Sequence, residues 1–204
     1  MKKGKIFIFL ILLIILVIGG YFGYNKFFGK RDPGKKAETI DNIDKYGYKL
    51  NDNASNYYKK LFKELKTILN KETVDDEEYA KKISQLFVTD LFTLSNKLTS
   101  SDVGGLDFVY KDFHDDFIAI AQSSLYSSVK SNIYGDRKQE LPEVSDVTVI
   151  KSKKEPFKIG DKTYDNAYTI NVEIKYVKDL GYPKKYNVVV INNEPNMEIV
   201  KSYE

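Results

Sequence analysis

The residue types best suited to chemistry gather in one short stretch, where Asp112, His114, Asp115 and Asp116 lie within five positions. Imidazole and carboxylate groups are common metal ligands and proton-transfer groups near neutral pH. Acidic residues also favour the first turn of a helix, and neighbouring residues on a helix point in different directions. Because a helix is expected to begin near Asp115, we interpret the stretch as a helix start. We predict no catalytic, cofactor-binding or metal-binding residues.

The composition restricts other kinds of site. The chain has no Cys and one His, so disulfides, thiolate metal sites and Cys nucleophiles are excluded. A zinc site or a Ser-His-Asp arrangement would depend on His114 alone. The glycine pairs Gly19-Gly20 and Gly104-Gly105 match no phosphate-binding loop. These observations predict a protein that is not an enzyme and carries no cofactor.

Basic residues concentrate at the N-terminus. Residues 1–36 carry eight Lys or Arg and one Asp, whereas residues 37–204 carry 24 basic and 28 acidic residues. Nucleic-acid binding depends on a cluster of positive charge that neutralises phosphates. The slightly acidic remainder of the chain therefore predicts that no nucleic acid is bound.

Residues 6–24 form a run of 19 residues without a charge, long enough to cross a bilayer as a helix. We predict a basic tail (1–5), a transmembrane helix (6–24) in contact with membrane lipid, and a basic juxtamembrane linker (25–38). A cleaved signal peptide is the alternative. Gly19 and Gly23 form a GxxxG pattern, which permits close approach of two membrane helices and makes a homo-oligomer one expectation.

The orientation of this helix has evidence on both sides. Five basic residues follow the apolar run and three precede it, which favours a cytoplasmic domain under the positive-inside rule. The short tail with three Lys instead resembles the start of a signal anchor, whose following domain is exported. We expect a single-pass protein of the cell membrane with an extracytoplasmic domain.

Helical spacing dominates the first half of the domain predicted over 54–204, which follows a poorly defined connecting segment at 39–53. Apolar residues recur at three- and four-residue steps, with capping residues at the starts. A short helix interrupted at Gly47 is expected over 40–50, and a second helix over 54–70. A third is expected from the Thr73 capping box to about 98. The fourth is expected over 115–130, with Phe117, Ile120, Ala121, Leu125 and Val129 pointing inward. A helical turn is expected at 105–113.

The period changes to two after Leu141-Pro142, which predicts strands. The first begins at Val147 and Val149, and three more cover 168–176, 186–191 and 197–203. Tyr164, Tyr168 and Tyr176 share one face with Ile170 and Val172, where we expect core or cavity lining. Short connections predict an antiparallel meander, and three helices on one face of it give an α+β fold.

This order of elements resembles the nuclear transport factor 2-like fold, a cone-shaped domain. The residues that carry the resemblance are 104–109, 117–126 and the terminal strand pair at 186–191 and 197–200. Met197 replaces a Trp that is frequent in the family. With a membrane helix in front, the arrangement is similar to inner-membrane assembly components of type IV secretion and conjugation machines. The resemblance implies a curved sheet, and protein partners in the bacterial envelope.

Three functions follow as hypotheses. The first is a non-enzymatic, membrane-anchored scaffold or assembly module. The second is a binding module that holds a small apolar molecule or an envelope lipid inside the cone. The third is an isomerase-like or hydratase-like enzyme, as in some relatives of this fold, which would need an Asp base and Tyr donors in an open pocket.

Overall fold

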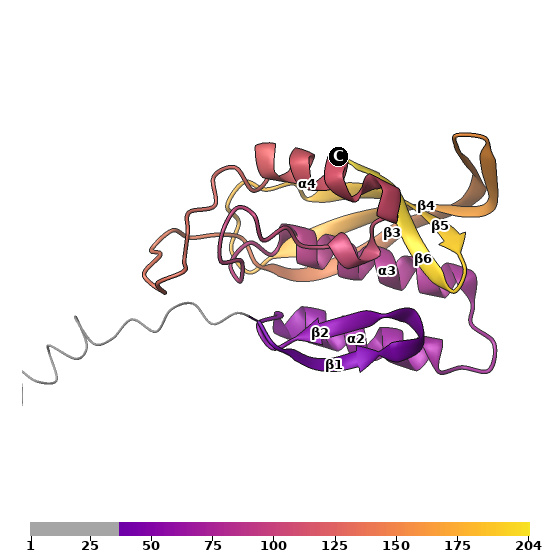
Figure 1. Cartoon of the computed structure of the whole chain (residues 1–204), viewed down its shortest axis with the longest axis horizontal. Coiled ribbons are helices and arrows are strands. Elements are labelled where there is room, and N and C mark those ends of the chain that lie inside the picture. The colour runs from indigo at the N-terminus through magenta and orange to yellow at the C-terminus, as the bar shows by residue number, and fades with distance from the viewer. Residues whose placement is uncertain (1–36) are drawn as a thin grey trace, which may run out of the picture.

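A computed structural model describes residues 37–204 as an α+β domain with three α-helices and a four-stranded antiparallel sheet (Figure 1). Among these residues no helix is long and apolar enough to cross a membrane. The predicted tail, the transmembrane helix at 6–24 and most of the linker lie outside the described residues. The coarse fold prediction is therefore confirmed for the domain alone.

The segment predicted as a short helix over 40–50 is a β-hairpin. Strands β1 (Thr39–Ile43) and β2 (Tyr48–Asn51) pair antiparallel around a single 3-10 turn, and Gly47 takes a φ of 74°. Tyr48 and Leu50 are buried while their neighbours are exposed, so the real period is two. The helical prediction was wrong because the turn itself placed Ile43 and Tyr46 at helical spacing.

Two long helices follow the hairpin. Helix α2 (Asn56–Leu69) begins where the Ser55 side chain accepts a hydrogen bond from the Tyr58 amide. Helix α3 (Asp76–Phe92) is capped by Asp75, which accepts from the Glu78 amide at 2.7 Å, rather than by Thr73. Helix α3 ends before the predicted 98 because the next amides, at Leu94 and Ser95, bond to the Pro142 carbonyl.

The third helix is shorter than predicted. Two 3-10 turns, η2 (Leu106–Phe108) and η3 (Lys111–Phe113), confirm the helical turn expected at 105–113. Helix α4 (His114–Ser123) then stops seven residues before Lys130. The chain leaves the helix at Ser124, and Tyr126 turns into the core with its side chain fully buried.

The sheet is a meander in the order β3-β4-β5-β6, as predicted. Its strands are β3 (Val144–Ile159), β4 (Lys162–Tyr176), β5 (Lys185–Asn193) and β6 (Asn196–Tyr203). Strands β3 and β4 form a long hairpin that extends beyond the rest of the sheet (Figure 1). The part of this hairpin that extends beyond the sheet was not predicted from the sequence, because the alternation of apolar and polar residues is broken there.

Tyr164 does not share a face with Tyr168, contrary to the prediction. Phe157 pairs with Tyr164 and Glu155 with Ala167, so two residues of β4 lie opposite one of β3. Such a bulge shifts the alternation by one position. Tyr164 therefore packs with Ala167 in a small separate cluster, whereas Tyr168 lies in the main core.

Helix α3 is the element that lies across all four strands of the sheet. Helix α2 packs mainly on α3, and the β1-β2 hairpin adds Tyr48 and Leu50 to the same core. Helix α4 lies beside β6 and touches α3 through Phe117 and Phe87, whose rings are 5.7 Å apart. Helix α2 therefore packs on α3, and α4 packs beside β6. The three helices do not form a single layer on one face of the sheet.

Candidate functional site

The acidic stretch near His114 is not gathered into a site. His114 lies half-buried, with its Nε2 atom 2.8 Å from the Val109 carbonyl, while Asp112, Asp115 and Asp116 are exposed. Within residues 37–204 no three His, Cys, Asp or Glu side chains are grouped so that they could hold a metal ion. The stretch lies at the start of α4, where acidic residues face the positive end of the helix.

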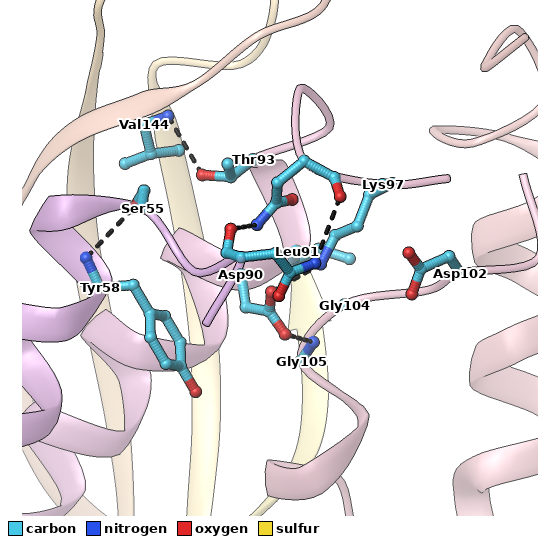
Figure 2. A network of polar contacts seen from close by, with 12 residues as sticks. Ser55, Tyr58, Asp90, Leu91, Thr93, Lys97, Asp102, Gly104, Gly105 and Val144 are labelled. Carbon is cyan, nitrogen blue, oxygen red and sulfur yellow. Dashed lines mark hydrogen bonds and ion pairs between the residues drawn. The ribbon is translucent and has the colours of Figure 1, made fainter. Parts of the chain in front are cut away.

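A polar network forms instead where α3 ends. We call the residues Asp90, Lys97, Gly104, Gly105 and Tyr126 the Asp90 network. Figure 2 shows the Asp90 carboxylate between Lys97 and Gly105. One oxygen lies 2.6 Å from the Lys97 ammonium, and the other accepts from the Gly105 amide at 2.6 Å.

The ion pair in this network is well shielded from water. The Lys97 side chain is 7% exposed and that of Asp90 is 29% exposed. A buried charge is tolerated when it is paired and hydrogen-bonded, and both conditions hold for Asp90. Its carboxylate thus holds the loop at Gly105 against the end of α3.

The turn at Gly104 and Gly105 needs glycine at both positions to make these contacts. Gly105 has a φ of 81°, a region that favours glycine. A Cβ atom on Gly104 would lie 2.2 Å from the Asp90 carbonyl oxygen. The Gly104 amide donates to the Tyr126 hydroxyl, which itself donates to the Leu91 carbonyl, both at 2.9 Å. The loop can thus approach α3 this closely only because Gly104 has no side chain.

A polar pocket of about 620 Å³ borders the Asp90 network. Tyr58 and Asp107 also line it. Desolvation and the negative charge of Asp90 raise the pKa of Asp107, and burial raises the pKa of Tyr58 well above its usual value. Both shifts favour the uncharged form of these two side chains.

An apolar groove lies between α4, the end of α3 and β6. It has a volume of about 320 Å³, and we call it the α4–β6 groove. Its lining residues include Leu91, Phe113, Phe117, Ile120, Tyr186 and Ile199. Ile120 was predicted to point inward, but 66% of it is exposed. Ile120 therefore leaves apolar surface in water beside the groove.

Neither the Asp90 network nor the α4–β6 groove was predicted from the sequence. Asp90 and Lys97 are seven residues apart and their ion pair becomes visible only when the chain leaves α3 at Phe92. A signal was present in the Gly104-Gly105 pair, since paired glycines permit a positive φ and predict a turn, but it did not identify the residues that the turn contacts. The groove had no signal, since α4 shows an ordinary apolar face and only the packing decides which of those residues remain uncovered.

Comparison with known proteins identifies no relative. No protein-family model matches the chain, and neither the curated proteins nor the solved structures contain a match. The geometry of the domain therefore carries the functional argument.

Proposed function

We propose that the chain is a non-enzymatic, single-pass membrane-anchored scaffold or assembly module of the bacterial envelope. The apolar run at 6–24 is the tether, and the domain over 37–204 faces the extracytoplasmic side. The observation that carries the proposal is the open α4–β6 groove with its exposed Ile120. A docking surface of this kind needs no reactive group.

The state of the polar side chains supports the non-enzymatic part of the proposal. Asp90 is bound by Lys97 and by a backbone amide, and His114 is bound to the Val109 carbonyl. The α4–β6 groove contains one acidic side chain, Asp116, which is exposed. The carboxyl group of raised pKa, Asp107, is exposed and lines the other pocket beside the paired Asp90, whereas an isomerase needs such a base enclosed in an apolar cavity.

The nuclear transport factor 2-like resemblance belongs to the same proposal. The order of elements from α2 onward, with helices before the sheet and a terminal strand pair, supports it, although the β1-β2 hairpin precedes α2. In that reading the domain acts beside the membrane as a component of a secretion or conjugation apparatus, and its partners are other envelope proteins.

A second candidate is a module that binds a small apolar molecule or a lipid. The lining of the α4–β6 groove favours it, because apolar side chains predominate there. The volume of about 320 Å³ lies at the low end of the range of roughly 300–1,000 Å³ for ligand pockets. The exposure of Ile120 also means that a bound molecule would remain partly in water, which makes docking of a protein the better-supported function.

Topology is the first test of the proposal. A single Cys at Glu194, which is exposed in the β5-β6 connection, can be labelled with a membrane-impermeant thiol reagent in a chain that has no other Cys. Labelling of intact cells is expected. Labelling only after lysis would place the domain in the cytoplasm and overturn the envelope setting, and lysed cells provide the control for reactivity.

A further inference from the structure

The last strand of the sheet has an outer edge that is only partly covered. Within the described part of the chain, β6 is an edge strand, and its outer edge pairs at one isolated bridge between Val109 and Ile199. The Tyr110 amide donates to the Ile199 carbonyl at 2.9 Å, and the chain then turns away into η3. The edge over Val200–Tyr203 therefore has no strand beside it.

At the opposite edge of the sheet, formed by β3, side chains from the helices bond to the backbone. On β3, the Val147 amide donates to the Tyr57 hydroxyl at 2.8 Å, and its carbonyl accepts from the Gln85 side chain at 2.7 Å. Side chains from α2 and α3 thus occupy backbone groups of that edge. Covering an edge in this way prevents the addition of another strand. At Val200–Tyr203 the Tyr203 carbonyl accepts from the Asn187 side chain of the neighbouring strand, and within residues 37–204 no helix side chain bonds the backbone of this segment.

The α4–β6 groove lies directly beside this free edge. Val200 to Ser202 line one side of it and the apolar residues of α4 line the other. A bulge at Val200 turns Ser202 toward the sheet face of the groove, where the Tyr186 hydroxyl lies 3.2 Å from the Ser202 hydroxyl. A strand placed beside β6 would therefore direct every second side chain into the groove.

We propose that an extended segment of a partner protein binds as an added strand beside Val200–Tyr203, with alternate apolar side chains in the α4–β6 groove. Strand addition takes affinity from main-chain hydrogen bonds and specificity from the pockets that receive alternate side chains. The proposal rests on the proposed docking function and specifies its site and the form of the partner.

Charge at the end of the groove defines the partner further. Asp112, Asp115 and Asp116 are exposed and form no ion pair with any residue of 37–204. Asp116 lines the groove itself. Lys201 of β6 also lines the groove, so the negative charge lies on the α4 side, where three like charges repel a partner with acidic residues and attract one with Lys or Arg. The segment is therefore an apolar strand with at least one basic residue at the end that meets α4.

The test uses the full chain in the membranes of the producing cells. A photo-crosslinking amino acid replaces Ser124, which is exposed at the groove, or Ile150, which is 60% exposed on the opposite edge strand and serves as the control. Crosslinked partner peptides are identified by mass spectrometry. Amide exchange of Val200–Tyr203 is then compared between the crosslinked complex and the free protein.

The expected result is a crosslink at position 124 and none at 150, to a segment with alternating apolar residues and a Lys or Arg, with slowed exchange at Val200–Tyr203. Ile120→Ser should lower the crosslinked fraction about tenfold, since it removes apolar contact area in the groove. The pair Asp115→Asn and Asp116→Asn should lower it about twofold to fivefold. The variant Ile150→Ser is the matched control and should leave the fraction unchanged.

Four other results would overturn the inference. Crosslinks to protein only from other faces would leave the docking function standing at a different site. A crosslink at 124 with unchanged exchange at Val200–Tyr203 would exclude strand addition. A crosslink at 124 to lipid would favour the apolar-ligand module. No protein crosslink from any exposed position would refute the docking function as well.

Discussion

The Asp90 network and the α4–β6 groove show two ways in which this domain treats its surface. In the network, charged and polar groups are drawn under a loop and bound by partners of the same chain, with Lys97 only 7% exposed. In the groove, apolar groups remain uncovered, with Ile120 66% exposed. The polar groups of the network are thus satisfied within the chain, whereas the apolar groups of the groove remain in contact with water.

The largest expected effect comes from breaking the ion pair of the network. Lys97→Met leaves the Asp90 carboxylate shielded but without its cation, which should lower the free energy of unfolding by about 3 kcal/mol. Asp90→Asn should cost a similar amount. Urea denaturation of the full chain in detergent, followed by circular dichroism, measures both. If the loss of unfolding free energy in the double variant equals the sum of the losses in the two single variants, the residues are not coupled and the network does not act as a unit.

Filling the close approach at the turn should have the next largest effect. Gly104→Ala places a Cβ atom 2.2 Å from the Asp90 carbonyl oxygen, so the loop must move and stability should fall by about 2 kcal/mol. Gly160→Ala is the control, because its Cβ would meet no atom within 4 Å although φ is 55°. It should cost about 1 kcal/mol from backbone strain alone. Equal losses in the two variants would argue against a tight contact at Gly104.

The hydroxyl of Tyr126 should contribute less. Tyr126→Phe keeps the ring but removes the acceptor for the Gly104 amide and the donor to the Leu91 carbonyl. The loss should be about 1–2 kcal/mol, because a buried amide is left without a partner. Thermal unfolding of the two proteins checks this. An unchanged melting temperature would show that the loop is held without the hydroxyl.

Asp107 provides a pH test of the polar side. Desolvation and the charge of Asp90 raise its pKa, so ionisation of Asp107 destabilises the folded state. The folded state is therefore stabilised at low pH, where Asp107 is protonated. This stabilisation is lost as the pH rises through the raised pKa of Asp107. Asp107→Asn should therefore be more stable than the natural chain at pH 7, by a few tenths of a kcal/mol, and the difference should vanish in acid. A difference that grows on acidification would contradict this sign.

The groove should give the smallest effect on stability. Ile120→Ser changes an exposed side chain, so the free energy of unfolding should stay within about 0.5 kcal/mol of the natural value. The same denaturation assay measures it beside Lys97→Met. A loss of several kcal/mol would mean that Ile120 belongs to the core, and the contrast between the two regions would fail.

Local pattern predicted much of the fold but little of the site. Helices α2 and α3 and the meander of β3 to β6 follow from apolar period and capping residues, which act over a few positions. The hairpin at 39–51 was missed because a tight turn imitates helical spacing. The face of Tyr164 was missed because a bulge leaves no reliable mark in the alternation.

The sequence by itself determined an α+β domain behind an apolar N-terminal run, since charge, period and turn residues are properties of neighbouring positions. Only the tertiary structure decided that Asp90 meets Lys97 and Gly105, that Tyr126 spans from Leu91 to Gly104, and that Ile120 stays in water beside the free edge of β6. These relations depend on where α3 and α4 end and how they pack, which is set by contacts between residues far apart in the chain.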